Sequence, residues 1–273
     1  MESKQVFADL PLAQRLERAE GAAALKFVEA RARHAPQVQA CWMECGGVYA
    51  LYDGPASPVT QTFGLGMFEQ ASPEILDRLE GFFRERGAPV FHEVSPLAGI
   101  ATVELLHTRG YWPMEFTSIL YKAVEENAQE TSGDGINVRT VEGQDAGIWA
   151  DVNARGWAAE QPELFEFLRD FGAMNAERGD FICFLAEHDG IPAAAGSLSI
   201  SSGVAMLAGA ATIPGKRRLG LQHALLAARL KYAENAGCDL AMMGALPGGS
   251  SQRNAERNGF RIAYTRIKWS SQP

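Results

Sequence analysis

The spacing of apolar residues predicts that the first half of the chain folds as one long helix followed by short strands and two further helices. The long helix covers residues 10–34, because leucines and alanines recur there at helical spacing and Pro36 follows its end. Gly46-Gly47 lies between two apolar stretches and predicts a hairpin turn. The other elements predicted in this half are strands at 39–44, 48–53, 59–66, 89–95 and 116–124 and helices at 73–86 and about 97–109.

Residues 125–135, EENAQETSGDG, are polar and acidic, and they predict a linker between domains at 1–124 and 136–273. The second half has a similar order of elements, which predicts two copies of one α/β unit. The local sequence agrees, because Gly110-Tyr111 corresponds to Gly259-Phe260. The alternative is that the halves are not copies, because any two α+β halves share some order of elements. The elements predicted after the linker are strands at 136–141, 180–187, 192–201, 203–213, 238–246 and 260–270 and helices at 143–156, 161–177, 217–236 and 250–258.

Composition is that of an ordinary globular protein, with 47% apolar and 21% charged residues among 273. The net charge of −8 argues against nucleic acid as a general partner, since binding phosphates requires a basic face. No apolar run approaches the roughly 18–20 residues that span a membrane. The charged N-terminus also lacks the apolar segment of a signal peptide. We therefore expect a cytoplasmic protein that binds neither membrane nor nucleic acid.

Cysteine and histidine spacing gives no support for a bound metal. The four cysteines do not form a C-x-x-C pair, and the five histidines are scattered outside the usual zinc-binding patterns. We expect free thiols at Cys41, Cys45, Cys183 and Cys238.

The stretch ATIPGKRRLGLQHALL, residues 211–226, carries the clearest chemical signal. Lys216, Arg217 and Arg218 stand where a strand leads into a helix, although the helix dipole disfavours cations at that end. A bound anion explains this, because first-turn N–H groups point outward, Gly220 leaves room and arginine suits phosphate oxygens. The alternative is a solvated basic turn. A P-loop is excluded, since five residues separate Gly209 from Gly215 and no Ser or Thr stands at the magnesium position.

Only the second copy carries these cations. The corresponding step in the first copy, GLGMFEQASPE, has two acidic residues, Glu69 and Glu74, and no cation. We therefore expect anion binding by the second copy alone.

The segment Arg217-Arg218-Leu219-Gly220-Leu221-Gln222 resembles the acyl-CoA pyrophosphate loop of the GNAT superfamily of N-acetyltransferases, whose pattern is R/Q-x-x-G-x-G/A. The strand ending in Thr-x-Pro before it, the apolar helix after it and the later Gly259-Phe260 strengthen the resemblance, which covers about 137–269 and weakly 38–124. It implies an α/β (α+β) fold of two GNAT-like units, each a mixed, mostly antiparallel twisted sheet flanked by helices. The resemblance also implies that the N-terminal copy is degenerate.

The resemblance implies acetyl-CoA as co-substrate, without a metal. It implies transfer of the acetyl group to a primary amine of a small molecule or peptide by a monomer or homodimer. The alternatives are a non-catalytic acyl-CoA-binding or structural module, and an aminoacyltransferase that uses charged tRNA, which the acidic charge disfavours. The residues implied to bind acetyl-CoA are Ala211, Thr212, Ile213, Arg217, Arg218, Leu219, Gly220, Leu221, Gln222, Ser251 and Asn254.

Two positions depart from the family pattern. Gln222 replaces the last Gly or Ala, although its backbone N–H remains available. Ala255 replaces the tyrosine that in many members protonates the departing thiolate. Tyr264 is the nearest tyrosine in sequence and is our candidate acid, with strand packing as the alternative. For the base, which the reaction also requires, the candidates are Glu160, Glu163, Glu187 or a water-mediated group.

Overall fold

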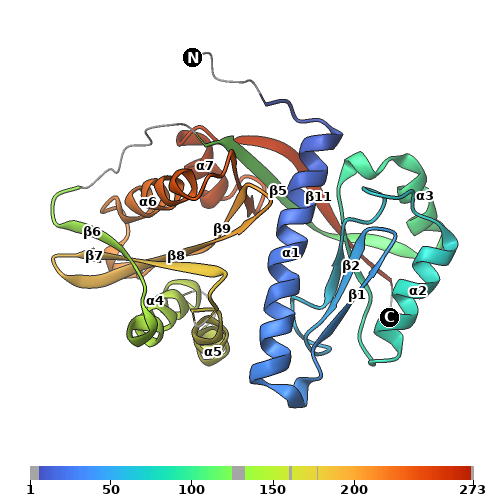
Figure 1. The fold of residues 1–273 in the computed structure, drawn as a ribbon, viewed down its shortest axis with the longest axis horizontal. Coiled ribbons are helices and arrows are strands. Elements are labelled where there is room, and N and C mark those ends of the chain that lie inside the picture. Colours follow the sequence, from blue (N-terminus) through green and yellow to red (C-terminus); the bar gives the residue numbers. More distant parts are fainter. Residues whose placement is uncertain (1–5, 125–132, 160–161, 177, 272–273) are drawn as a thin grey trace. The chain divides into compact units, whose positions relative to one another are not determined.

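A computed structural model of the protein describes residues 6–124, 133–159, 162–176 and 178–271 (Figure 1). Its internal contacts define two compact units. Unit 1 contains the chain up to Lys122 together with the chain from Met242 onward, and unit 2 contains Ala123–Ala241. Both units combine helices with mostly antiparallel strands, which confirms the predicted mixed α/β fold class.

Unit 1 places the C-terminal strand of the chain among the strands of its N-terminal part. Neighbouring strands are antiparallel except for β3 and β4, which pair in parallel. Its helices are α1 (Leu10–His34), α2 (Pro73–Arg84), α3 (Ile100–Thr108) and α7 (Ser250–Arg257). In spatial order, its strands are β1 (Cys41–Cys45), β2 (Val48–Tyr52), β3 (Gln61–Phe63), β4 (Phe91–Val94), β11 (Arg261–Ser271) and β5 (Tyr111–Ala123).

Local sequence explains the start of the unit 1 helices and the first hairpin. The Asp9 side chain accepts a hydrogen bond from Leu12 N at 3.0 Å and caps α1. Ser72 caps α2 in the same way, with a proline in the first turn. The predicted turn between β1 and β2 is confirmed, since Gly46 and Gly47 have φ of +59° and +77°, which glycine adopts at little cost.

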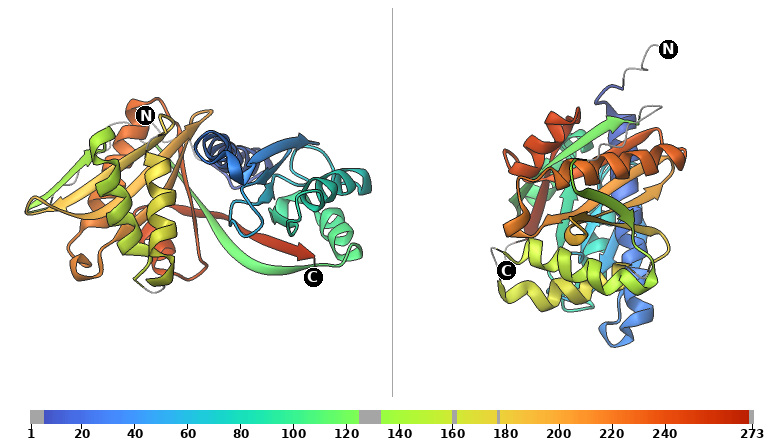
Figure 2. Two further views of the ribbon diagram at one scale, coloured as in Figure 1. Left: turned by 90° about the horizontal axis from the view of Figure 1, so that it is seen from below. Right: turned by 90° about the vertical axis from the view of Figure 1, so that its left-hand side faces the viewer.

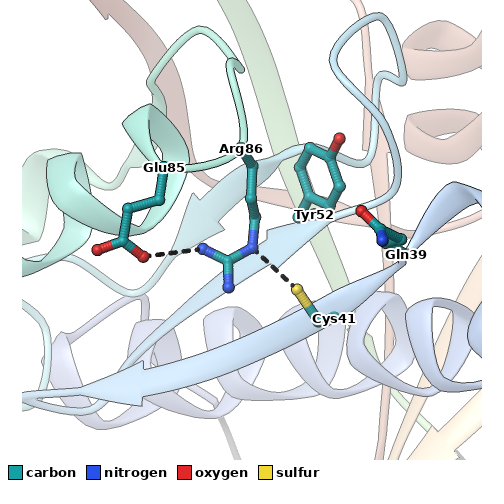
Figure 3. A pocket seen from close by; sticks show the side chains of 5 residues that line it. All are labelled: Gln39, Cys41, Tyr52, Glu85 and Arg86. Carbon is teal, nitrogen blue, oxygen red and sulfur yellow. Dashed lines mark hydrogen bonds and ion pairs between the residues drawn. The ribbon is translucent and has the colours of Figure 1, made fainter.

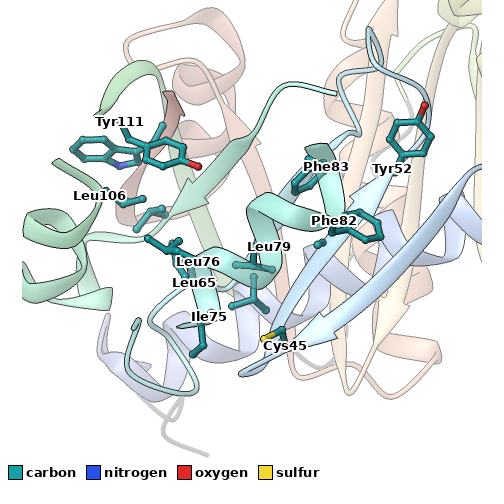
Figure 4. Packing of buried hydrophobic residues seen from close by; sticks show 14 residues of the cluster. Cys45, Tyr52, Leu65, Ile75, Leu76, Leu79, Phe82, Phe83, Leu106 and Tyr111 are labelled. Atoms are coloured by element: carbon teal, nitrogen blue, oxygen red, sulfur yellow. The ribbon is translucent and has the colours of Figure 1, made fainter. Parts of the chain in front are cut away.

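The core of unit 1 lies between the sheet and α2 (Figure 4). Helix α2 buries one apolar face at helical spacing, while its opposite face is exposed. Leu106 of α3 and Tyr111 of β5 belong to the same cluster. The residues that α2 contributes are Ile75, Leu76, Leu79, Phe82 and Phe83.

In the described part of unit 2, strands β6 to β9 pair antiparallel in chain order and have helices on both faces. Helices α4 and α5 cover one face and α6 covers the other (Figures 1 and 2). The alternation of β7 agrees, because Cys183 and Leu185 pack with Trp149 of α4, whereas Phe184 contacts Tyr232 of α6. The elements are β6 (Ile136–Thr140), α4 (Ala146–Trp157), α5 (Phe165–Ala176), β7 (Phe181–His188), β8 (Ile191–Ser201), β9 (Val204–Thr212) and α6 (Leu221–Asn235).

The structure bears on three predictions from the sequence, namely the start of α6, the linker and the limits of the two copies. Helix α6 begins at Leu221 and not at 217, because Arg218 and Gly220 have φ of +69° and +85°, outside the helical region. Residues 125–132 of the predicted linker lie outside the described residues. Contacts group β11 with unit 1, and β10 (Leu240–Ala245) spans the boundary between the units. The two units are defined by contacts, whereas the two predicted copies are defined by the order of elements along the sequence. The limits of the copies at 1–124 and 136–273 therefore stay a prediction.

Across the described residues, no helix is both long and apolar enough to cross a membrane. The same residues contain no group of three or more His, Cys, Asp or Glu side chains that could hold a metal ion.

A buried charge network joins α1 to the sheet of unit 1. The Arg266 guanidinium lies 2.8 Å from Glu20, 2.9 Å from Glu93 and 3.5 Å from Glu17. The Tyr264 hydroxyl donates to Glu17 Oε1 at 2.8 Å, whereas Oε2 of the same carboxylate has no partner among the described residues. Burial raises the pKa of Glu17 from 4.5 to about 7, although the Arg266 charge partly offsets this. The network therefore has one carboxylate that favours a proton.

This raised pKa predicts a pH-dependent stability. A folded-state pKa above the unfolded value stabilises the fold fully below about pH 4.5, and this stabilisation is lost as the pH rises through about 7. The Glu17 contribution is on the order of 3 kcal/mol at most. We expect Glu17→Gln to remove this slope in urea unfolding between pH 5 and 8. The control Glu44→Gln, on a half-exposed surface pair with Arg18, should keep the slope, and an unchanged slope in Glu17→Gln would contradict the assignment.

Candidate functional site

Strand β9 brings the chain to the candidate site through a bulge. Ala211 pairs with Ala195 and Ala208 pairs with Ser197, so two residues of β9 oppose the single residue Gly196 of β8. Gly209, one of the two, has φ of +60°. Beyond the bulge, Ala211 is buried and Thr212 is half-buried. The bulge therefore sets the direction in which β9 ends.

The chain between β9 and α6 has a backbone conformation that suits anions. Pro214–Lys216 forms one turn of 3₁₀ helix, Arg217 is extended with φ −69° and ψ 155°, and Arg218 follows at φ +69°. A positive φ is uncommon for a residue other than glycine. Turns and pairs of right- and left-handed residues can direct successive N–H groups toward an anion, and this loop contains left-handed residues at Arg218 and Gly220.

The three cations of this loop lack acidic partners. Arg217 and Arg218 are exposed and Lys216 is half-buried. Neither an ion pair nor a side-chain hydrogen bond joins any of them to another residue in the described part of the chain. Their charges are therefore free to act on a ligand.

The start of α6 is open. Gly220 is the N-cap residue, and no side chain of the described residues caps the helix. The Gln222 side chain is engaged with β9, because its Nε2 donates to Thr212 Oγ1 at 2.7 Å. The departure from the family pattern at Gln222 thus adds a tie between α6 and β9, and it leaves the backbone N–H groups uncovered by that side chain.

The corresponding step of the first copy is filled by its own side chains. A Cβ added at Gly66 would lie 2.5 Å from Thr102 Oγ1 and 2.9 Å from Ala98 Cβ, so this backbone is in close contact with α3 and the turn before it. Leu65 and Met67 on either side are buried. This packing agrees with the expectation that only the second copy binds an anion.

The predicted ligand set is divided between the two units. Nine of its residues, Ala211 to Gln222, lie together at the end of β9 and the start of α6 in unit 2. Ser251 and Asn254 belong to unit 1, where they lie on α7 with the buried Ala255. The Asn254 carbonyl accepts a hydrogen bond from Asn258 at 2.8 Å. A role in binding acetyl-CoA stays a prediction for all eleven.

Tyr264 is held in the unit 1 network. Its side chain is buried and donates to Glu17 at 2.8 Å. Burial and the neighbouring Glu17 charge raise the pKa of Tyr264 well above its usual value of 10. These contacts are those of a structural tyrosine, while the proposed catalytic role stays untested.

The candidate bases occupy different surroundings. Glu187 accepts hydrogen bonds from Arg139 at 2.9 Å and from Asn137 at 3.3 Å across the β6–β7 edge. Glu163 is exposed in a short 3₁₀ turn at Pro162–Leu164. Glu160 lies outside the described residues. Of the two described, Glu163 is the one without an ion-pair partner.

Sequence reasoning missed two side chains at the β9 bulge, Asn153 and Arg229. Asn153 donates to the Gly209 carbonyl, and Arg229 is buried against the Ala208 carbonyl. The only available signal was an arginine within the otherwise apolar stretch of α6.

A pocket of about 430 Å³ lies in unit 1 near the end of α2 (Figure 3). Arg86 Nε donates to Cys41 Sγ at 3.1 Å, and Arg86 Nη1 lies 3.6 Å from Glu85. Gln39 and Tyr52 complete the lining. None of the residues predicted to bind acetyl-CoA lines this pocket.

Solved structures similar to this chain include GCN5-related N-acetyltransferases and a tandem GNAT protein. A GCN5-related N-acetyltransferase from Kribbella flavida matches 92% of this chain and 96% of its own, with a TM-score of 0.66 and 18% identity. A tandem GNAT protein from the clavulanic acid biosynthesis pathway matches 98% of both chains, with a TM-score of 0.62 and 14% identity. A functionally unknown conserved protein from Staphylococcus epidermidis matches 86% of this chain and 96% of its own, with a TM-score of 0.63 and 6% identity.

No protein-family model and no curated protein matches the chain. The structural matches nevertheless cover nearly the whole chain. They confirm the tandem GNAT fold that the sequence resemblance implied.

The open start of α6 predicts the effect of a charge at Gly220. An added Cβ would meet only Ile136 Cδ1 at 3.6 Å, and Asp and Asn tolerate positive φ better than most residues. We expect Gly220→Asp to remain folded and to weaken CoA binding by at least about tenfold through repulsion of the phosphates. Calorimetry with CoA measures this.

The matched control is Gly220→Asn, which has the same shape without the charge and should bind CoA more tightly than Gly220→Asp. The wild-type titration should give one CoA per chain, because the first copy lacks the cations. Equal affinity in both folded variants, or two CoA per chain, would contradict this assignment.

The contacts of Tyr264 predict a structural effect on its removal. Tyr264→Phe leaves Glu17 with one hydrogen bond fewer, which should lower the free energy of unfolding by about 1–3 kcal/mol. Turnover should fall less than about tenfold, below the 10²–10⁴ range of general acid catalysis. Urea unfolding and steady-state kinetics test this. A larger fall in turnover with unchanged stability and CoA affinity would show that Tyr264 is the acid.

Proposed function

We propose that the protein is an acetyl-CoA-dependent N-acetyltransferase that moves an acetyl group to a primary amine. The observation that carries this proposal is the unpaired cationic loop Lys216–Arg218 before the uncapped start of α6. A helix N-terminus with free N–H groups and adjacent arginines suits the pyrophosphate of CoA. The chain also has the fold of solved GCN5-related N-acetyltransferases.

In the proposed reaction the amine attacks the thioester carbon directly, loses a proton and expels the CoA thiolate. The second copy would bind acetyl-CoA through the loop before α6. The first copy, whose corresponding step is closed around Gly66, would serve packing or the acceptor. The acceptor is a small molecule or a peptide, and the protein acts in the cytoplasm as a monomer or homodimer.

A second candidate function is acyl-CoA binding without catalysis. Ala255 supplies no hydroxyl group, and the Tyr264 hydroxyl is bound to Glu17. These observations favour a binder if no other group completes proton transfer.

Acetyl-CoA turnover against a panel of primary amines separates the two functions. Release of free CoA that depends on one class of amine, and that Gly220→Asp slows at limiting acetyl-CoA, supports the enzyme. Tight CoA binding without turnover on any amine supports the binder, and absence of CoA binding by the wild-type protein overturns both.

A further inference from the structure

The bulge of β9 is held from both faces of the unit 2 sheet. Asn153 of α4 donates to the Gly209 carbonyl, while the Ala208 carbonyl accepts from Ser197 Oγ at 2.9 Å and from Arg229 Nη1 at 3.5 Å. Bulges leave carbonyl groups outside the regular ladder, and these groups need other donors. Side chains supply those donors here.

Arg229 reaches three elements from a buried position. Its Nε donates to Leu225 O of its own helix at 3.1 Å, and its Nη1 lies 3.3 Å from Ser197 O of β8. With Ala208 O of β9, the guanidinium therefore joins α6 to β8 and β9 at the bulge.

This arrangement is unusual for a charge. Buried charges are ordinarily paired with an opposite charge, yet Arg229 contacts only neutral carbonyls among the described residues. Burial lowers the pKa of Arg229 to about 10, so the guanidinium remains charged at neutral pH. Its three hydrogen bonds to carbonyl groups offset part of the desolvation cost of this charge.

Two of the three elements that Arg229 contacts, β9 and α6, carry nine of the residues predicted to bind acetyl-CoA. β9 ends at Thr212, α6 starts at Leu221, and the bond from Gln222 to Thr212 also joins them. We infer that Arg229 is a positioning residue that holds the end of β9 and the start of α6 in the relative arrangement the CoA pyrophosphate requires. This inference rests on the proposed function.

The variant Arg229→Met removes all three hydrogen bonds and keeps an unbranched stem. We expect it to weaken CoA binding by at least about tenfold, the loss of one charged hydrogen bond. Amide hydrogen exchange of residues 206–212 should become faster in the absence of any ligand. A gentler variant is Gly196→Ala, whose Cβ would lie 3.2 Å from Arg229 Cζ and displace the guanidinium without removing its charge.

The matched control is Arg178→Met, because Arg178 is another buried arginine of unit 2, bonded to Asn175 and Asp180. It should lower the melting temperature while CoA affinity and exchange of residues 206–212 stay at wild-type values. Calorimetry with CoA and exchange measured by mass spectrometry, both well below the melting temperatures, give the two readouts.

Unchanged exchange of residues 206–212 in folded Gly196→Ala and Arg229→Met overturns the inference, as does faster exchange with unchanged CoA affinity. Equal loss of CoA affinity in Arg178→Met also overturns it, since the effect would then follow general destabilisation. Failure of the proposed function is distinguishable, because it appears as absent CoA binding by the wild-type protein before any substitution.

Discussion

The candidate site depends on the N–H groups at the start of α6, which no side chain caps. Most helices satisfy this end with Ser, Thr, Asp or Asn, as α1 and α2 do with Asp9 and Ser72. At α6 the N-cap is Gly220, and Arg218 just before it has a positive φ. The unmet donors and the three cations add positive potential at one point of a chain whose net charge is −8.

The two copies differ in how the step from strand to helix is satisfied. In the first copy, a capped α2 and a closely packed Gly66 satisfy the same step internally. In the second copy, the strand that leads into the open loop is held by two side chains of α6. Arg229 donates to the Ala208 carbonyl at the bulge, and Gln222 donates to Thr212. The exposed cations can then remain unpaired without loosening the strand that leads to them.

Local sequence was sufficient for several elements and insufficient for others. Ser72 and the following proline predicted the start of α2, because capping is a short-range interaction. The start of α6 was placed four residues too early, since the spacing of apolar residues does not reveal the positive φ of Arg218. The resemblance to the pyrophosphate loop, in contrast, identified the residues that lie together there.

Long-range contacts could not be read from the sequence. The place of β11 between β4 and β5 depends on pairings between distant segments. The same holds for the bond from Tyr264 to Glu17, which spans 247 positions and gives that tyrosine its structural surroundings. The role of Arg229 was hidden for a similar reason, because its partners are carbonyl groups on two strands and carry no side-chain signature.

The missing family tyrosine at Ala255 is compatible with a working enzyme under the proposed function. A thiol with the ordinary pKa of about 8.5 lies only about 1.5 units above neutral pH, so expelling the thiolate unprotonated costs roughly 2 kcal/mol relative to the thiol. A general acid contributes about 10²–10⁴-fold, and water can supply part of this. Loss of the donor therefore slows the proposed reaction without removing its driving force. Loss of the anion site would be more serious, because it removes the binding of the co-substrate itself.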